Sequence, residues 1–442
     1  MIGVIADDIT GANDIGSMFA KADHLTHIYM YASGGSFDLS AAERPDVLIL
    51  DTDSRFDPAE RAYEKVFSAA HTLQVAGCTR YYKKICSVFR GNIGAELDAL
   101  LDGLGERFVL VVAGFPKTGR LTIEGIHYVH GQKLEDSDFR RDPVHPMTRS
   151  NLVEILQSQT HRTVRHLSYR DIARGPDALQ ASIEARKPDT NYLLLDVAGQ
   201  EALATIAIAA QSERVIVGSS GLAEELAQLW SEHRSHAPPV HFPPRLHLGV
   251  LCVAGSVTPQ TAAQVAHLRA QGTRVFELDT FRLFDPHERA AEIERLLQLI
   301  APRLRLGQDV VLSSASRADV AEQTQVIGMT RGLAAVAIAR LVSETIAKLV
   351  AAVVDRTGQN RLLVAGGDTA AAICSALSIR GMRVWKEIEP GVASCVSLSA
   401  PPVVLVLKAG GYGTADFFER AIRHLQTTGD GDINSPPALR RA

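Results

Sequence analysis

Three glycine-rich turns lie in the C-terminal half of the chain, and each follows an apolar run typical of a buried strand. The turns are Gly255-Ser256, Gly366-Gly367-Asp368-Thr369 and Gly410-Gly411-Tyr412-Gly413. Glycine lets a backbone approach a ligand closely, and a helix that opens after a strand points unpaired N–H groups at that ligand. Because such turns bind phosphate, three of them in one half predict a nucleotide-sized anion at the carboxyl edge of a parallel sheet.

Two common phosphate-binding motifs are missing from the sequence. No Gly-Lys dipeptide occurs, which excludes a P-loop, and no G-x-G-x-x-G fingerprint occurs, which weakens a dinucleotide interpretation. Asp368 or Thr369 could instead serve only as the N-cap of the helix that follows. The two companion turns favour a ligand, and the cap stays open as the alternative.

Carboxylates follow the predicted strands of the first half. Asp7 and Asp8 come directly after an apolar run over residues 2–6, and Asp51, Asp53 and Arg55 follow a second run over residues 47–50. Adjacent carboxylates at a strand end are costly unless they contact a ligand, a metal or a basic partner, although one of the two could simply cap a helix. These strand ends are therefore candidates for a binding site.

A third strand end adds cations. Lys83 and Lys84 close a run over residues 79–84, and Arg90-Gly91-Asn92 precedes the next helix. A solvated charge run is the usual interpretation of a Lys-Lys pair, but an arginine and an asparagine at a helix start are not typical of a plain surface. Carboxylates can bind the hydroxyl groups of a ligand, and cations can bind its carboxylate or phosphate. Their combination at one sheet edge predicts a small polyhydroxy acid as the ligand.

Other catalytic chemistries find little support. The 15 histidines form no H-E-x-x-H pattern, and His145 is the one histidine in a segment suited to an active site. The five cysteines are scattered without a C-x-x-C pair, which predicts buried reduced thiols rather than disulfides or a zinc site. No G-x-S-x-G elbow occurs, and Cys86 has no evident base partner. No metal ligand is predicted.

The elements that must position these residues predict an α/β protein of two domains. Both halves alternate apolar runs with amphipathic helical patterns, so we expect each to hold a largely parallel sheet flanked by helices, with the active site in the cleft between the domains. Residues 115–150 break this rhythm, and long irregular segments are usually lids or binding loops. The expected strands cover residues 2–6, 27–31, 47–51, 79–84, 108–113, 192–196, 214–218, 248–254, 273–277, 309–313, 361–365 and 403–409.

A proline-rich stretch over residues 236–245 sets the domain boundary, because its prolines and its lack of apolar periodicity fit an extended linker. Residues 1–235 are expected to bind the substrate and residues 246–426 the nucleotide. Residues 427–442 are expected to form a flexible tail.

Composition restricts the partners. The formal net charge of −4 argues against nucleic acid, and no apolar run reaches the roughly 18 residues of a membrane span. The N-terminus lacks the basic region and apolar stretch of a signal peptide. We expect a cytoplasmic protein with small-molecule partners, no nucleic acid and no membrane, while a homo-oligomer stays open.

The motifs, taken in order, resemble the four-carbon acid sugar kinase family over nearly the whole chain. The resemblance implies an ATP-dependent 4-kinase that phosphorylates the 4-hydroxyl of D-threonate or D-erythronate, with a 3-oxo-tetronate as the alternative. It also implies that the N-terminal domain holds the acid sugar and the C-terminal domain holds ATP. The motifs that carry it are Ala6-Asp7-Asp8-Ile9-Thr10-Gly11, Thr52-Asp53-Ser54-Arg55, Tyr82-Lys83-Lys84, Ser87-Val88-Phe89-Arg90-Gly91-Asn92, Asp142-Pro143-Val144-His145-Pro146-Met147-Thr148, Gly218-Ser219-Ser220-Gly221, Gly255-Ser256, Gly366-Gly367-Asp368-Thr369 and Lys408-Ala409-Gly410-Gly411-Tyr412-Gly413.

The resemblance, together with the polar residues at the strand ends, implies which residues contact the acid sugar and which contact ATP. The residues expected to contact the acid sugar are Asp8, Arg55, Lys83, Lys84, Ile85, Cys86 and Arg90. The residues expected to contact ATP are Ser256, Gly366, Gly367, Asp368, Thr369, Gly410 and Gly411. Many family members carry an aspartate where this chain has Cys86, so the stereochemistry of the acid stays open.

A kinase must position both reactants and neutralise phosphate charge, which implies Mg²⁺ on the nucleotide and a base for the acceptor hydroxyl. Asp368 is the favoured base and Asp8 the rival. Arg55 and the lysines would pair with the substrate carboxylate, while Asp8 would fix a hydroxyl. Two other classes fit less well: an NAD-dependent sugar-acid dehydrogenase needs the missing fingerprint, and a non-enzymatic sugar-acid sensor needs no phosphate-binding turns.

Overall fold

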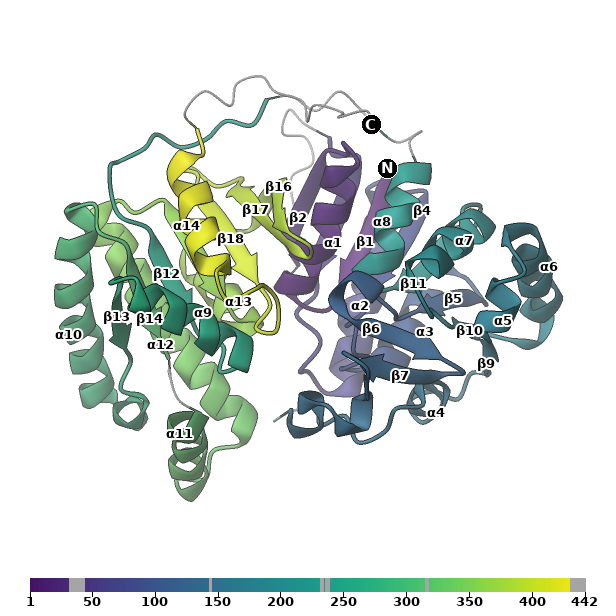
Figure 1. Cartoon of the computed structure of the whole chain (residues 1–442), viewed down its shortest axis with the longest axis horizontal. Coiled ribbons are helices and arrows are strands. Elements are labelled where there is room, and N and C mark those ends of the chain that lie inside the picture. Colours follow the sequence, from purple (N-terminus) through teal and green to yellow (C-terminus); the bar gives the residue numbers. More distant parts are fainter. Residues whose placement is uncertain (32–43, 143–144, 231–233, 235–238, 315–317, 430–442) are drawn as a thin grey trace. The chain divides into compact units, whose positions relative to one another are not determined.

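The computed structural model describes residues 1–31, 44–142, 145–230, 234, 239–314 and 318–429 (Figure 1). The chain forms two compact units, Met1–Ser235 and His236–Ala442. Both units are α/β, so the predicted fold class is confirmed. The expected linker is described only over residues 239–245, which form no helix or strand, and the expected tail lies outside the described residues from residue 430 onward.

The N-terminal unit is built on a parallel sheet with the strand order β2-β3-β1-β4-β11-β5-β10-β9. Most of its strands are continuous apolar runs, because helices cover both sides of a parallel sheet. β9 was not expected from the sequence, since its residues alternate Val-Arg-His-Leu without a continuous apolar run. The strands are β1 Ile2–Ala6, β2 Thr26–Met30, β3 Val47–Asp51, β4 Arg80–Lys84, β5 Val109–Val112, β9 Val164–Leu167, β10 Tyr192–Leu195 and β11 Val215–Gly218.

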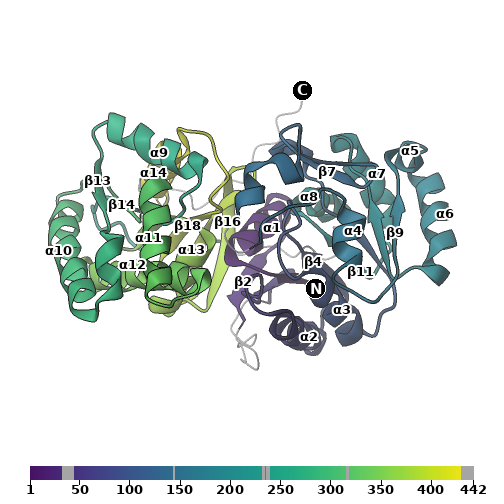
Figure 2. The same cartoon turned by 90° about the horizontal axis from the view of Figure 1, so that it is seen from below.

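The helices of this unit pack in two groups on opposite faces of the sheet. α2 and α3 pack against each other, and α8 packs against both α1 and α7 (Figure 2). The helices are α1 Ile9–Lys21, α2 Ala59–Val75, α3 Ile93–Leu104, α4 Leu152–Gln157, α5 Tyr169–Ile172, α6 Pro176–Arg186, α7 Gln200–Ala210 and α8 Ser220–Leu229.

Residues 115–150 are more ordered than the irregular loop that the sequence predicts. They contain a small antiparallel sheet of β6 Arg120–Ile123, β7 Ile126–Val129 and β8 Gln132–Lys133. Glu124 and Gly125, which join β6 to β7, both have positive φ, as the tightest hairpin turns require. Asparagine or aspartate before glycine is the usual signal for such a turn, so Glu-Gly did not reveal it.

The C-terminal unit is built on a mixed sheet with the order β13-β14-β12-β15-β18-β17-β16. The pairs from β13 to β18 are parallel, whereas β17 is antiparallel to both β18 and β16. The sequence signal for this unexpected hairpin was present in Pro390-Gly391, where Gly391 has a φ of 83°. The strands are β12 Leu251–Ala254, β13 Arg274–Glu277, β14 Val310–Ser313, β15 Arg361–Ala365, β16 Gly381–Glu389, β17 Val392–Ser397 and β18 Val404–Lys408.

Helices again cover both faces of this sheet. α12 packs against α10 and α13, while α9 packs against α14 on the other side (Figure 2). The long helix α12 begins at residue 335, because Gly332 has a φ of 81° and separates it from the preceding helix. The helices are α9 Pro259–Ala270, α10 Pro286–Arg305, α11 Ala318–Thr330, α12 Ala335–Thr357, α13 Gly367–Ala376 and α14 Phe417–Thr427.

Both sheets reverse their strand order beside the first strand of the unit. β1 lies between β3 and β4, and β12 lies between β14 and β15. In open α/β sheets, ligands bind outside the carboxyl ends of strands at such a reversal. The residues that follow β1 and β12 are Asp7-Asp8 and Gly255-Ser256. The two places where the fold favours ligand binding therefore coincide with two of the sites predicted from the sequence.

Candidate active site

Arg55 joins two aspartates at the carboxyl ends of β1 and β3. Its Nε and Nη2 donate to the two carboxylate oxygens of Asp7 at 2.7 and 2.9 Å. Its Nη1 and Nη2 also donate to the two carboxylate oxygens of Asp8, both at 2.7 Å. Burial alone would raise the pKa of Asp7, but Arg55, with the two lysines of β4, holds that pKa well below its ordinary range. The Arg55 guanidinium is therefore already paired within its own chain, and is not the open cation that the sequence suggested.

Asp8 also starts helix α1. Its Oδ1 accepts a hydrogen bond from the N–H of Gly11 at 2.9 Å, and its Oδ2 accepts one from the Thr10 hydroxyl at 2.6 Å. Asp8 is thus the N-cap of α1, the alternative that the sequence left open for one of the two aspartates. With both oxygens bound to Arg55 and to the helix start, Asp8 is a poor candidate for a free general base.

Lys83 and Ile85 face the interior of the N-terminal unit. The Lys83 side chain is fully buried, and its Nζ lies 2.7 Å from Oε2 of Glu96 on α3. Oε1 of Glu96 accepts a hydrogen bond from the Ser54 hydroxyl at 2.6 Å, which fixes the segment that carries Arg55. Ile85 is also fully buried, and its N–H donates to the carbonyl of Gly218 at 3.0 Å. We therefore remove Lys83 and Ile85 from the expected substrate contacts.

Lys84 points toward the start of α1. Its Nζ donates to the Ile85 carbonyl at 3.1 Å and lies 3.7 Å from a carboxylate oxygen of Asp14. A Cβ on Gly11 would lie 3.3 Å from that Nζ and 2.5 Å from Oδ1 of Asp8. Gly11 therefore lets the ammonium of Lys84 and the carboxylate of Asp8 approach the same helix turn.

Arg90 is the most exposed cation of this group, with 22% of its side chain accessible to solvent. Its Nη1 donates to Asp142 at 2.6 Å, whereas its buried Nε makes no hydrogen bond of ordinary geometry within the described residues. Burial raises the pKa of the Cys86 thiol, but Arg90 and Arg55 outweigh burial, so the net pKa is lowered. We call Asp7, Asp8, Arg55, Lys84, Cys86 and Arg90 the strand-end cluster.

Asp51, at the end of β3, is a charged residue that the sequence did not single out as a contact. It is 2% exposed, and burial, Asp53 and Asp8 together raise the pKa of Asp51 well above its ordinary range. A protonated carboxyl group can donate a hydrogen bond beside the carboxylates of the strand-end cluster. The sequence placed Asp51 at a polar strand end, but it gave no sign that burial and neighbouring carboxylates would raise the pKa of this residue.

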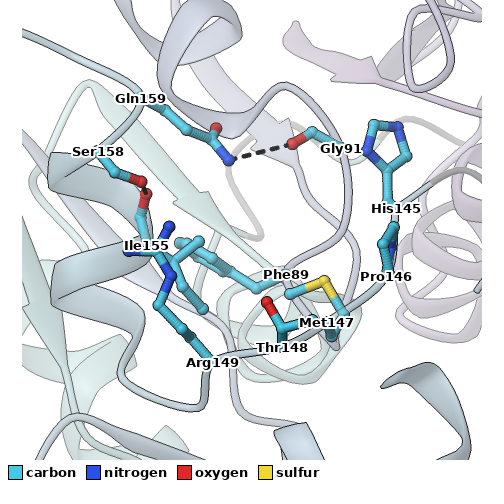
Figure 3. A pocket seen from close by; sticks show the side chains of 10 residues that line it. All are labelled: Phe89, Gly91, His145, Pro146, Met147, Thr148, Arg149, Ile155, Ser158 and Gln159. Carbon is cyan, nitrogen blue, oxygen red and sulfur yellow. Dashed lines mark hydrogen bonds between the residues drawn. The ribbon is translucent and has the colours of Figure 1, made fainter. Parts of the chain in front are cut away.

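The N-terminal unit has a cavity of about 210 Å³, and Figure 3 shows the residues that line it. Gly91 lines it, and a Cβ on Gly91 would lie 3.3 Å from Cγ of Arg55. His145 also lines it, and its Nε2 lies 2.7 Å from the Arg55 carbonyl, so Nε2 carries the proton. The histidine singled out in the sequence thus borders both the cavity and the Arg55 segment. The other lining residues are Phe89, Pro146, Met147, Thr148, Arg149, Ile155, Ser158 and Gln159.

The three glycine-rich turns meet in the C-terminal unit. A Cβ on Gly255 would lie 1.9 Å from Oγ1 of Thr369, and a Cβ on Gly410 would lie 2.2 Å from Oγ of Ser256. Gly366 has a φ of 121°, and a Cβ there would lie 3.2 Å from the backbone nitrogen of Ser256. The ends of β12, β15 and β18 therefore touch at positions where only glycine fits.

Asp368 lies in the first turn of α13 and is exposed. The N-cap of α13 is Gly366, and no side chain makes a capping hydrogen bond. Neither Asp368 nor Thr369 therefore serves as the N-cap, the alternative that the sequence left open. An exposed carboxylate at the meeting point of the turns suits a group that contacts a reactant.

Two threonines and a glutamine hold the turn after β18, and the sequence gave no sign of them. The hydroxyls of Thr258 and Thr261 donate to the Gly410 carbonyl at 2.7 and 3.0 Å. Nε2 of Gln264 donates to the carbonyls of Tyr412 and Thr414, both at 3.0 Å. These residues lie at or near the start of α9, so one helix fixes the position of the turn.

The comparisons with known proteins place these two sites in a family. Residues 2–226 match the model of a sugar-binding N-terminal domain, and residues 251–418 match the model of a nucleotide-binding C-terminal domain. A 3-oxo-tetronate kinase of Pseudomonas fluorescens is 32% identical over 434 residues, which cover 96% of this chain and 97% of the relative. A D-threonate kinase of Salmonella typhimurium is 28% identical over 438 residues, which cover 97% of this chain and 99% of the relative.

A solved structure has the same fold as this chain. A protein of Salmonella typhimurium LT2, described as a candidate tRNA synthase, superposes with a TM-score of 0.79 at 28% identity and covers 96% of this chain and 99% of that one. Two α/β units with a sugar-binding and a nucleotide-binding domain define a sugar kinase, a phosphotransferase with a hydroxyl acceptor. The chain belongs to the four-carbon acid sugar kinase family, which confirms the resemblance seen in the sequence and sets aside the dehydrogenase and sensor alternatives.

Two further searches cover only the described part of the chain. No helix there is long and apolar enough to cross a membrane. No group of three or more histidine, cysteine, aspartate or glutamate side chains there is placed to hold a metal ion.

Proposed function

We propose that this kinase transfers the γ-phosphate of ATP to the 4-hydroxyl of a four-carbon sugar acid. The observation that carries the proposal is the meeting of the three glycine-rich turns, where Gly255 contacts Thr369 and Gly410 contacts Ser256. Turns that bring backbone N–H groups together without intervening side chains suit a polyphosphate. The nucleotide would lie along Ser256, residues 366–369, Gly410 and Gly411.

The relatives favour a ketone at C3 of the acid. Relatives named 3-oxo-tetronate kinase reach 32% identity, against 28% for the D-threonate kinase. We therefore place 3-oxo-tetronate first and keep D-threonate and D-erythronate, which the sequence favoured, as the next candidates. All three offer a carboxylate at one end and a hydroxyl at the other.

The strand-end cluster would hold the acid. Arg90, which has the most exposed side chain and a buried N–H without a hydrogen bond of ordinary geometry, is the first choice for the substrate carboxylate, with Lys84 as its companion. Arg55 would act through Asp7 and Asp8, since its guanidinium bonds both. Asp8 is no longer the first choice for fixing a substrate hydroxyl, because its four hydrogen bonds from Arg55, Thr10 and Gly11 already use the roughly four acceptor sites of a carboxylate.

Asp368 would accept the proton of the 4-hydroxyl as that oxygen attacks the γ-phosphorus and ADP leaves. Its exposure and its place in the first turn of α13, beside the glycine-rich turns, support this choice over Asp8, which is the N-cap of α1. Mg²⁺, when bound, would neutralise phosphate charge during the transfer. In the absence of a ready-made metal cluster in the described residues, the nucleotide phosphates would supply most of its ligands.

A substrate panel tests the proposal. Purified protein is incubated with ATP, Mg²⁺ and one acid at a time, namely 3-oxo-tetronate, D-threonate, D-erythronate or L-threonate, and ADP release is followed. We expect one acid to give a kcat/KM at least about tenfold above the others, since a polar group that finds no partner costs more than 1 kcal/mol. No ADP formation above background with any of the acids would contradict the proposal.

A further inference from the structure

Lys408 is a fully buried lysine directly beneath the turn of Gly410. It is the last residue of β18, and its side chain has no solvent exposure. Within the described residues no carboxylate forms an ion pair with its ammonium group. Its Nζ instead donates to neutral acceptors, the carbonyls of Ala409, Gly410 and Tyr412 at 3.0, 2.9 and 3.0 Å and the Thr261 hydroxyl at 3.2 Å.

These bonds orient the peptide groups of the turn. The ammonium of Lys408 and the side chains of Thr258, Thr261 and Gln264 draw the carbonyl oxygens of the turn toward the interior. In the part of the chain that the structure describes, the N–H groups of Gly410 and Gly411 make no hydrogen bond to protein. Successive peptide N–H groups turned away from the carbonyls form a concave site for an anion.

The charge of Lys408 is only partly balanced by its surroundings. Burial of a cation without an anion is costly, and carbonyl dipoles offset part of that cost. Burial lowers the pKa of Lys408 to about 7, while Glu389 opposes the change. An anion bound at the turn would supply the missing negative charge.

The other charged groups around this lysine are few. Glu389, at the end of β16, is paired with Arg420 of α14 at 2.6 Å. Arg420 also bonds Asp416 at 3.1 Å, so a single cation is shared by these two carboxylates. From α9 the neighbours are the uncharged Thr261 and Gln264, from α14 the ring of Phe418, and from β15 the paired residue Ala365.

We infer that Lys408 is a positioning residue of the nucleotide site, whose buried ammonium both shapes the Gly410 turn and is charge-balanced by the bound phosphates. The inference rests on the proposed nucleotide-binding role of this unit. It has a consequence that a merely structural lysine would not have: because an anion favours the charged form, nucleotide binding must take up a proton when Lys408 is partly neutral.

The sign of the effect follows from the same linkage. Binding raises the pKa of Lys408, so nucleotide affinity is greatest below pH 7 and falls as the pH rises above the pKa of the free protein. The fall is up to about tenfold per pH unit until the pKa of the complex is reached. Proton uptake at pH 8 would approach one proton per nucleotide.

Calorimetry of MgADP binding to the full chain tests the inference. The heat of binding is measured at pH 6 and pH 8 in two buffers that differ in ionisation enthalpy, which gives the number of protons exchanged. The wild type is compared with Lys408→Met, Lys408→Arg and the matched control Lys386→Met, an exposed lysine of β16. We expect proton uptake at pH 8 in the wild type and the control, none in Lys408→Arg, and binding at least about tenfold weaker in Lys408→Met.

The outcomes separate this inference from the proposed function. If the wild type binds MgADP without proton uptake at pH 8, the charge-balancing role is overturned, whatever the variants do. If Lys408→Met is folded and binds MgADP as tightly as the wild type, the positioning role is overturned while the nucleotide site stands. If the folded wild type shows no affinity for MgADP at either pH, the proposed function fails together with the inference.

Discussion

Gly255 and Thr369 lie so close that a Cβ on Gly255 would stand 1.9 Å from the Thr369 hydroxyl oxygen. The two residues are far apart in sequence, and each follows a different strand of the C-terminal sheet. Their contact shows that the turns after β12 and β15 form one structure. It also explains why residue 255 is a glycine. The cause is the lack of space for a side chain, not an unusual backbone angle.

This contact predicts the effect of Gly255→Ala. The methyl group would push the two turns apart, because Thr369 is β-branched and stiff. We expect a lower melting temperature and a loss of MgADP affinity of at least about tenfold, as for overpacking that costs 1–3 kcal/mol. Gly411→Ala is the matched control, since a Cβ there meets nothing within 4 Å. The control should keep the melting temperature, and equal destabilisation of both variants would contradict the packing argument.

Arg55→Ala should weaken the fold as well as the binding of the acid. Removal of the guanidinium leaves Asp7 and Asp8 as buried carboxylates without their partner, a change that typically costs about 3–5 kcal/mol. Urea denaturation measures the loss of unfolding free energy. Arg61→Ala, at an exposed pair on α2, serves as the control and should change stability little. A fully stable Arg55→Ala would return Arg55 to a role in substrate contact alone.

The ion pair between Arg55 and Asp7 also predicts how the stability of the fold changes at low pH. The pKa of Asp7 is lowered in the folded protein, so its contribution to stability is present above the unfolded pKa of about 3.9 and is lost as the pH falls toward the folded pKa. The wild type should therefore lose stability steeply below about pH 4. Arg55→Ala should lose less over the same range, because protonation there relieves repulsion between Asp7 and Asp8. Identical acid profiles would contradict the assignment.

Arg90→Met should raise the KM for the acid and leave the KM for ATP unchanged. A charge-assisted hydrogen bond is worth roughly 1.5–3 kcal/mol, which corresponds to a ten- to hundred-fold increase in KM. The exposed Arg165 of β9, changed to methionine, controls for loss of positive charge in the same unit. If Arg90→Met binds the acid normally, Lys84 becomes the better candidate for the carboxylate.

Asp368→Asn should lower the catalytic rate without weakening the fold. Asparagine has nearly the shape of aspartate, so we expect a normal melting temperature and retained MgADP binding. Loss of a general base typically lowers kcat by 10²–10⁴-fold. The exposed Asp355 of α12, changed to asparagine, is the control. Turnover within a few-fold of the wild type would show that the carboxylate is not the base, and recovery at raised Mg²⁺ would reassign it to metal binding.

The C-terminal unit should bind nucleotide when isolated, provided that its first residues are kept. Arg361 is 6% exposed, and its Nη2 and Nη1 donate to the carbonyls of Pro243 and Pro244 at 3.3 and 3.4 Å. A fragment of residues 239–442 should therefore be more stable than one of residues 246–442, and it should bind MgADP with near-normal affinity. A folded longer fragment without affinity would show that the nucleotide site needs the N-terminal unit.

Sequence could predict the strands and the turns because their signals are local. The apolar runs that became β1, β3 and β15 were delimited to the residue, since buried parallel strands are continuous in sequence and end in glycine or aspartate. The meeting of Gly255, Gly366 and Gly410 also followed, because parallel strands bring their carboxyl ends to one edge.

The pairing of charges could not be predicted in the same way. Nothing local shows that Lys83 turns inward to Glu96 while its neighbour Lys84 faces α1, or that Arg55 is taken by Asp7 and Asp8. These partners lie on different elements, and only the packed structure decides between them. Lys408 belongs to one of the motifs seen in the sequence but was given no role there, since a lysine that ends a strand is usually exposed.

The position of the phosphate in the product tests the central claim most directly. The wild-type enzyme is allowed to convert the preferred acid with ATP and Mg²⁺, and the product is examined by ³¹P and ¹H NMR. We predict a phosphate monoester whose phosphorus couples to the protons on C4, formed in equal amount with ADP. A phosphate on the carboxylate or on another hydroxyl, or ADP released without a phosphorylated acid, would contradict a 4-kinase.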